Sequence, residues 1–225
     1  MRDGQRSRQR LLDAATHEFA AFGIAGARVD RVAAGAQVNK AQMYSWYGSK
    51  DGLFDAVFAL HLHRIVDAVP FTPDDLPGYA VALYDSYLTD PELVRLASWK
   101  RLERVPTGEL LAAHPTHADA KHAAIARAQA DGQIIGGIRP DEVYALVIAL
   151  AGTWSPVSGT FTASLTDGNA EHERRRGVLR EVVRRAFVGS ADPDGPRQLG
   201  APDARLSDNS SPPDRRCDGS VGRRG

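Results

Sequence analysis

The sequence is short of cysteine, of long apolar runs and of any charge surplus, and each shortage excludes a class of protein. One of its 225 residues is cysteine, so we expect neither a disulfide framework nor a zinc site made of paired cysteines. The longest apolar run, residues 143–152, has about half of the ~20 residues that a membrane-spanning helix needs. The first residues lack the apolar stretch of a secretory signal. The sequence therefore predicts a cytoplasmic protein with no membrane partner.

Charge is balanced over the whole chain, with 28 basic and 28 acidic residues. A protein of zero net charge is a poor candidate for coating DNA indiscriminately, so any affinity for DNA must come from a local patch. Residues 1–60 hold eight Lys or Arg against six Asp or Glu, and four of those arginines fall within the first ten positions. Phosphate contacts and a solvated terminus explain this cluster equally well.

Motifs of catalysis are also missing. The sequence contains no G-x-S-x-G elbow, no glycine-rich phosphate loop and no H-E-x-x-H pair, so we expect no enzyme activity and no cofactor. Its seven histidines are not spaced as ligands of one metal ion. We expect them to be solvated and expect no metal site.

The pattern that is present is helical. Apolar residues recur at spacings of three and four almost throughout, and no useful segment alternates with period two, which predicts an all-α fold. Gly23 should end the first helix, and Asp90 followed by Pro91 should begin the sixth. The expected helices cover residues 12–22, 29–35, 40–46, 50–69, 76–88, 91–105, 117–131, 141–151 and 170–187.

Residues 32–54 carry most of the functional information. Two short helical patterns are joined by a tight connection, and the second contains Lys40, Gln42 and Tyr44, side chains suited to base edges and phosphates. Ser49 then caps a third helix that begins at Lys50. This is the layout of a helix-turn-helix, which presents a short helix to the DNA major groove.

The same region resembles the TetR family of bacterial transcriptional regulators over residues 6–57. The resemblance rests on the pattern Ala14-Ala15, Phe19, Gly23, Val32-Ala33, Ala36, Val38-Asn39-Lys40-Ala41, Met43-Tyr44, Tyr47-Gly48-Ser49-Lys50-Asp51 and Leu53-Phe54. It implies a homodimer with a helix-turn-helix DNA-binding domain at 6–52 and a larger helical domain at 53–189 for ligand binding and dimerisation. Residues 190–225, rich in Pro, Gly, Arg and Asp, are expected to be a disordered tail.

By position, the resemblance places Lys40, Gln42 and Tyr44 on the recognition helix and Lys50 at a phosphate. The chemistry agrees, because Gln can bond adenine and Lys can bond guanine or phosphate. Tyr47 is expected to pack beneath the helix instead. The predicted DNA-binding residues are Arg28, Lys40, Gln42, Tyr44, Ser45, Trp46 and Lys50.

Two departures from the family pattern have structural consequences. Gln37 stands at the turn position that is usually Gly, and a Gln can occupy the left-handed conformation only at a strain cost of ~1 kcal/mol, so we expect the turn to differ locally. Ala27 and Arg28 replace the Thr that often caps the second helix, so that cap is lost.

The second half of the chain shows no motif of similar specificity. Its aromatic residues, with nearby carboxylates, could enclose a lipophilic cation through cation–π attraction, or each ring could simply fill the core. The predicted ligand-binding residues are Tyr84, Tyr87, Trp99, Glu103, Trp154 and Phe161. The last two helices have broad apolar faces that a symmetric partner would cover in a four-helix bundle, with Arg174–Arg176 and Arg184–Arg185 as its solvated rim.

The sequence therefore predicts a homodimeric, sequence-specific DNA-binding transcriptional regulator. We expect a repressor that a small lipophilic ligand, with a cation as one option, releases from a palindromic double-stranded DNA operator. The alternative is a helical DNA-binding or architectural protein without a ligand response.

Overall fold

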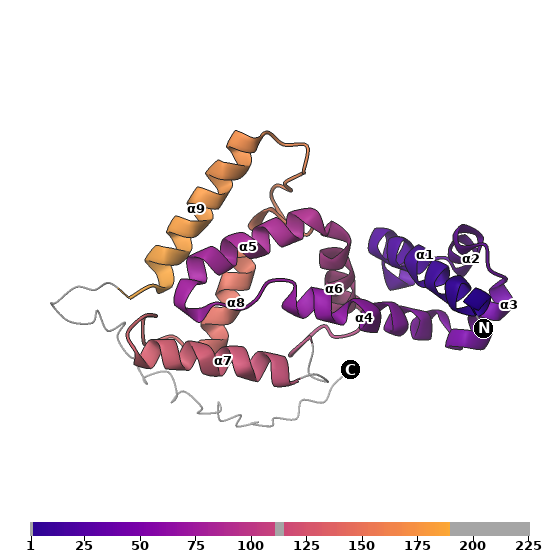
Figure 1. Ribbon diagram of the computed structural model, residues 1–225, viewed down its shortest axis with the longest axis horizontal. Helices are drawn as coiled ribbons and strands as arrows, with labels where there is room; N and C mark the ends of the chain where they lie inside the picture. Colours follow the sequence, from indigo (N-terminus) through magenta and orange to yellow (C-terminus); the bar gives the residue numbers. More distant parts are fainter. Residues whose placement is uncertain (1, 111–114, 190–225) are drawn as a thin grey trace, which may run out of the picture. The chain divides into compact units, whose positions relative to one another are not determined.

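The computed structural model describes residues 2–110 and 115–189, and this part of the chain is helical (Figure 1). Its only β feature is an isolated antiparallel bridge between Ile134 and Val188, which confirms the all-α prediction. The predicted disordered tail, 190–225, lies outside the described residues. The helices are α1 (Arg2–Gly26), α2 (Val29–Ala36), α3 (Lys40–Tyr47), α4 (Lys50–Asp67), α5 (Leu76–Thr89), α6 (Pro91–Glu103), α7 (Pro115–Ala130), α8 (Pro140–Ala151) and α9 (Asn169–Phe187), with short 3-10 turns at Pro73–Asp75 and Gly152–Trp154.

Gly23 breaks α1 where the sequence predicted an end. Its φ of 71° and ψ of −178° interrupt the helical geometry, and a further turn continues to Gly26. A Cβ at this position would lie 2.5 Å from the Glu103 carboxylate and 3.0 Å from the Trp99 ring. Both the backbone conformation and the approach of α6 therefore require glycine here.

Side-chain caps begin α3, α4 and α5, and the one at Ser49 was predicted. The Ser49 hydroxyl accepts the Gly52 amide at 2.9 Å, and Asn39 accepts the Ala41 amide at 2.8 Å. Asp90 does precede α6, but its carboxylate does not cap that helix. It accepts instead from the Arg64 guanidinium at 2.9 Å, because a hydrogen bond between two charged groups is stronger than one to a neutral amide.

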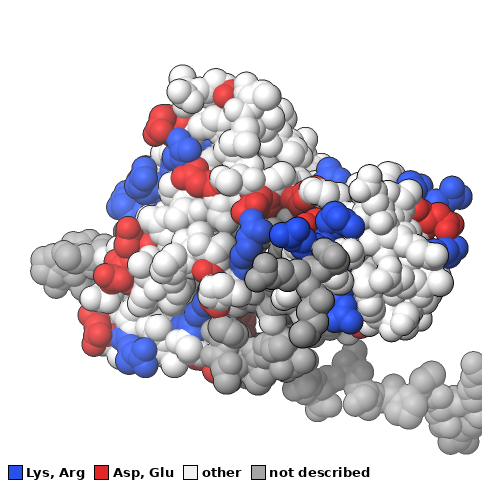
Figure 2. All heavy atoms as spheres, turned by 45° about the vertical axis from the view of Figure 1, so that its right-hand side comes forward, with Lys and Arg blue, Asp and Glu red and all other residues white. Residues whose placement is uncertain are grey.

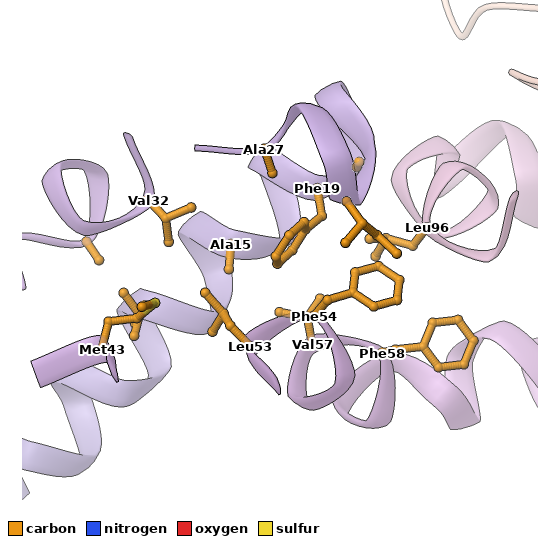
Figure 3. Close-up of a cluster of buried hydrophobic side chains, with 14 of the residues drawn as sticks. Ala15, Phe19, Ala27, Val32, Met43, Leu53, Phe54, Val57, Phe58 and Leu96 are labelled. Carbon is orange, nitrogen blue, oxygen red and sulfur yellow. The ribbon is translucent and has the colours of Figure 1, made fainter. Parts of the chain in front are cut away.

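The buried apolar residues form two clusters. The first joins α1–α4 with Leu93 and Leu96 of α6, and Figure 3 shows Leu96 beside Phe19 and Phe54. The two phenyl rings meet edge to face at 5.2 Å. The second cluster joins α5, α7, α8 and α9. A domain boundary between residues 52 and 53 stays a prediction, and the first cluster extends past it along α4 and into α6.

Candidate DNA-binding surface and ligand cleft

The connection between α2 and α3 depends on a strained residue. Gln37 has φ 55° and ψ 44° and is the only non-glycine residue with positive φ in the described part of the chain. Its amide donates to the Ala34 carbonyl at 3.1 Å, which closes the end of α2. Gln37 therefore adopts the left-handed conformation in spite of the strain cost, and this part of the turn does not show the expected local difference.

The missing cap of α2 is replaced from another helix. Arg28 occupies the cap position without a side-chain bond, and the buried Glu18 of α1 accepts its amide at 2.7 Å. Glu18 also accepts from the Arg31 guanidinium at 2.5–3.0 Å. Burial alone would raise the pKa of Glu18, but the hydrogen bonds from Arg31 and the Arg28 amide outweigh it and lower the pKa. Sequence reasoning missed this residue; a lone acid on the apolar side of α1 was its only signal.

The outer face of α3 brings the predicted DNA-reading residues together. Lys40, Gln42, Tyr44 and Ser45 are exposed, while Met43 on the opposite side is fully buried. A single buried anchor therefore fixes which face of the helix points outward. The Lys40 ammonium lies 2.8 Å from the Asp30 carboxylate, so in the protein without DNA this cation already has a partner.

The aromatic residues at the end of α3 have a different role. Trp46 and Tyr47 are partly buried against the first cluster, and burial raises the pKa of Tyr47. The predicted packing of Tyr47 is confirmed. The Arg8 guanidinium lies 5.2 Å from the centre of the Trp46 ring, which places a basic group of α1 beside the recognition helix.

Lys50 is placed at the first residue of α4, where its ammonium donates to the carbonyls of Ala25 and Ala27 at 3.0 and 3.2 Å. The same cation therefore ties the end of α1 to α4. Arg28, which follows Ala27 in the sequence, is exposed. Contact of all seven predicted residues with DNA stays a prediction.

Figure 2 shows how charge is distributed on one face of the molecule. Basic residues occur in small groups with acidic residues among them, and no extended area of one sign covers this face. This distribution fits the balanced composition. Affinity for DNA must then depend on a few correctly placed contacts.

A cleft of about 410 Å³ lies among α5, α6 and the segment after α8. It gathers three of the predicted ligand-binding residues, Tyr84, Tyr87 and Trp154, with the charged Glu92 and Arg95 on its wall. The Tyr84 and Trp154 rings meet edge to face at 5.8 Å. Burial raises the pKa of Tyr87 to about 12, so its hydroxyl remains protonated at neutral pH. A more open hollow of about 620 Å³ is lined by α1 and α2 alone and offers less enclosure.

The other three predicted ligand-binding residues do not line this cleft. The Trp99 indole donates to the Ala20 carbonyl at 3.3 Å. The Glu103 carboxylate accepts the amides of Ile24 and Ala25 at 3.1 and 2.8 Å. Both residues thus attach the second half of α6 to the end of α1. Phe161 is 53% exposed.

A buried polar group lies behind the cleft. The Tyr84 hydroxyl is 2.7 Å from His172 Nδ1, and both residues are buried. The neighbouring Arg175 is 3% exposed, pairs with Asp167 at 2.6 Å and lies 5.1 Å from the Phe161 ring centre. The predictions of solvated histidines and of a solvated Arg175 are therefore wrong for these two residues. Their hydrogen-bonded partners make burial possible.

The last two helices each bury one half of their apolar face. Val147 and Val183 are fully buried, whereas Leu146, Val178 and Val182 are 47%, 43% and 42% exposed. The inner halves complete the second cluster. The outer halves leave aliphatic surface on both helices for a partner to cover.

No helix among the described residues is long and apolar enough to cross a membrane. No group of three or more His, Cys, Asp or Glu side chains is arranged to hold a metal ion in that same part of the chain.

Comparisons with known proteins agree with this architecture. Residues 11–57 match the family of bacterial regulatory proteins called the tetR family, and residues 75–185 match the tetracyclin repressor-like C-terminal domain. The HTH-type transcriptional repressor SCO4008 of Streptomyces coelicolor is 35% identical over 187 residues, which are 82% of this chain and 96% of that protein.

Solved structures give the same result. The putative transcriptional regulator SCO4942 of Streptomyces coelicolor is 33% identical, with a TM-score of 0.66 over 80% of this chain and 98% of that one. A TetR family regulator from Marinobacter aquaeolei VT8, 20% identical, shares the fold with a TM-score of 0.59 over 84% of this chain and 100% of its own. The chain belongs to the TetR family of bacterial transcriptional regulators.

Proposed function

We propose that this protein is a dimeric repressor that reads a palindromic operator with α3 and leaves it when a lipophilic ligand occupies the cleft. Regulators of this family bind DNA operators and act as dimers with small-molecule effectors. The observation that carries the proposal is the outer face of α3, where three polar side chains suited to DNA project opposite the buried Met43. The relative SCO4008, named a repressor, supports the direction of control.

Each side chain would contact the operator in a different way. Gln42 can bond both N6 and N7 on the major-groove edge of an adenine, whereas Lys40 must exchange the Asp30 carboxylate for a base or phosphate. That exchange costs little, because an exposed ion pair contributes about 0–1 kcal/mol. Lys50, which is tied to two carbonyls, would contact phosphate with its remaining N–H and set the register without reading sequence.

Dimerisation would use the outer faces of α8 and α9. A second copy related by a two-fold axis would bring the same faces together and cover Leu146, Val178 and Val182 in a four-helix bundle. Val182→Glu should therefore give a monomer in analytical ultracentrifugation. Val157→Glu, at a residue that is 52% exposed outside these helices, is the matched control and should remain a dimer.

Ligand release requires a path from the cleft to the DNA-binding helices, and α6 provides one. Its first turns line the cleft through Glu92 and Arg95, and its last turns hold α1 through Trp99 and Glu103. A ligand that shifts α6 would change how α1 is held. It must bind the shifted arrangement more tightly than the operator-bound one, since equal affinity moves no equilibrium.

The experiment is binding of the purified protein to the DNA that flanks its own gene, against random DNA of equal length. Fluorescence anisotropy at two salt concentrations separates phosphate attraction from sequence reading. The proposal predicts saturable binding to one flanking sequence and its reversal by lipophilic compounds. Equal affinity for flanking and random DNA would contradict operator binding. If the protein preferred the flanking DNA but no lipophilic cation, anion or neutral compound reversed its binding, the ligand response would be contradicted.

A further inference from the structure

One carboxylate on α6 faces both the cleft and the DNA-binding helices. Glu92, in the first turn of α6, is on the wall of the cleft. Its Oε1 also lies 2.7 Å from Nδ1 of His17 on α1. The side chains of the pair are 44% and 70% exposed, so the carboxylate is held in place by this contact rather than by burial.

The cleft surrounds this carboxylate with aromatic surface. Tyr84, Tyr87 and Trp154 line the same cleft as Glu92, and aromatic rings together with a carboxylate attract an aromatic cation. Arg95 is the other charged group of the cleft. It is exposed and has no ion-pair partner among the residues that the structure describes, so its long side chain can move away from a bound cation into solvent.

We propose that Glu92 is a shared carboxylate, which bonds either His17 of α1 or the cationic group of an aromatic ligand in the cleft. The inference rests on the proposed ligand-responsive repression. It adds the class of the ligand, and it adds the residue pair, Glu92 and His17, through which occupancy of the cleft changes how α1 is held.

The exchange requires the Glu92 carboxylate, whose Oε1 contacts His17, to rotate about its side-chain bonds. Both oxygens of a carboxylate turn together about the same bonds, so turning Glu92 toward a ligand lengthens its 2.7 Å contact with His17. The contacts of Trp99 and Glu103 in the second half of α6 then hold α1 without the contact at Glu92. A ligand that fills the cleft without reaching Glu92 would bind and leave the operator complex intact.

Two probes of one shape and opposite charge test the ligand class on the full chain. Tetraphenylphosphonium should bind the DNA-free protein more tightly than tetraphenylborate. Glu92→Gln should weaken tetraphenylphosphonium about two- to five-fold, and Arg95→Gln should strengthen it by a similar factor, as expected for partly exposed charges. Asp119→Asn, which removes a carboxylate of α7 that does not line the cleft, should change neither. Tighter binding of the borate, or shifts of the opposite sign, would overturn the cationic class.

His17→Ala tests the sharing. Without its competitor, Glu92 should bind tetraphenylphosphonium about two- to five-fold more tightly in DNA-free protein, and the ligand-induced loss of operator affinity should shrink by the same factor. In the double variant with Glu92→Gln, the His17 effect should vanish.

The outcomes separate this inference from the proposed function. If His17→Ala changes neither ligand affinity nor the release ratio while Glu92→Gln weakens the ligand, Glu92 binds ligand but is not shared. If the wild-type protein shows no operator preference, the proposed function fails, and the DNA-free titrations still decide whether Glu92 exchanges partners.

Discussion

Replacing Gln37 by glycine should stabilise the protein, although it removes a side chain from the helix-turn-helix. Gln37 has φ 55° and ψ 44°, where a Cβ crowds the following carbonyl. Its side chain is exposed and forms no hydrogen bond in the described part of the chain. The substitution therefore removes strain without removing a contact.

The expected gain is a difference of two terms. A left-handed residue with a side chain costs about 1–2 kcal/mol, and glycine costs about 0.5–1 kcal/mol in additional backbone entropy. From the middle of each range, the net stabilisation is about 0.75 kcal/mol. For a chain of this length that corresponds to an increase in Tm of roughly 1–4 °C.

Urea unfolding followed by circular dichroism measures this difference, with protein concentration held constant because dimerisation contributes to apparent stability. Gln37→Ala keeps the Cβ and should show no gain, and Gln37→Asn should fall between the two because asparagine tolerates this conformation. A Gln37→Gly midpoint at or below that of Gln37→Ala, with unchanged slope, would refute the strain argument.

Three further predictions concern the DNA-binding helices. Gln42→Ala should cost about 1–3 kcal/mol on the operator and relax preference at one base pair, whereas Lys50→Ala should weaken binding to all sequences alike; equal losses on operator and random DNA would remove Gln42 as a base reader. Asp30→Asn should free Lys40 and raise DNA affinity about two- to five-fold with a steeper salt dependence, and an unchanged titration would show that the ion pair does not compete with DNA. Glu18 has a pKa below its ordinary value of 4.5, so its contribution to stability is present above pH 4.5 and is lost as the pH falls through the lower pKa of the folded state. Glu18→Gln should therefore reduce the loss of stability at acidic pH, measured as the free energy of urea unfolding at several pH values. If the variant and the wild type lost the same free energy over this pH range, the assignment would be contradicted.

Features that depend on near neighbours could be predicted from the sequence. Apolar spacing gave the helices, and Ser49 capped α4 as expected, because these properties are decided within one or two turns. The strain cost at Gln37 could be predicted from its place in a short turn, but that the turn would keep the left-handed conformation could not, because the packing of α2 against α3 decides it. The resemblance to a family added the domain order.

Features that depend on residues far away in the sequence could not be predicted. Glu103 accepts amides 78 and 79 residues away, and no local pattern distinguishes such an acid from one in a ligand cleft. Arg175 was expected in the solvated rim of a four-helix bundle, yet it is buried, with Asp167 as its ion-pair partner and Phe161 beside it. Tyr84, Tyr87 and Trp154 line one cleft, as the aromatic content allowed, but which rings would meet depended on how α5 packs against the turn that follows α8.

The contribution of Leu93 and Leu96 to the first cluster constrains the design of hybrid regulators. A chimera that joins the first four helices to another protein's ligand domain would remove both leucines from the interior around Phe54 and Phe58. The recipient must then supply side chains of matching shape, or α6 must be transplanted with the helices that it covers. The boundary at which a chimera should be divided therefore lies between the two clusters, and the chain crosses this boundary more than once.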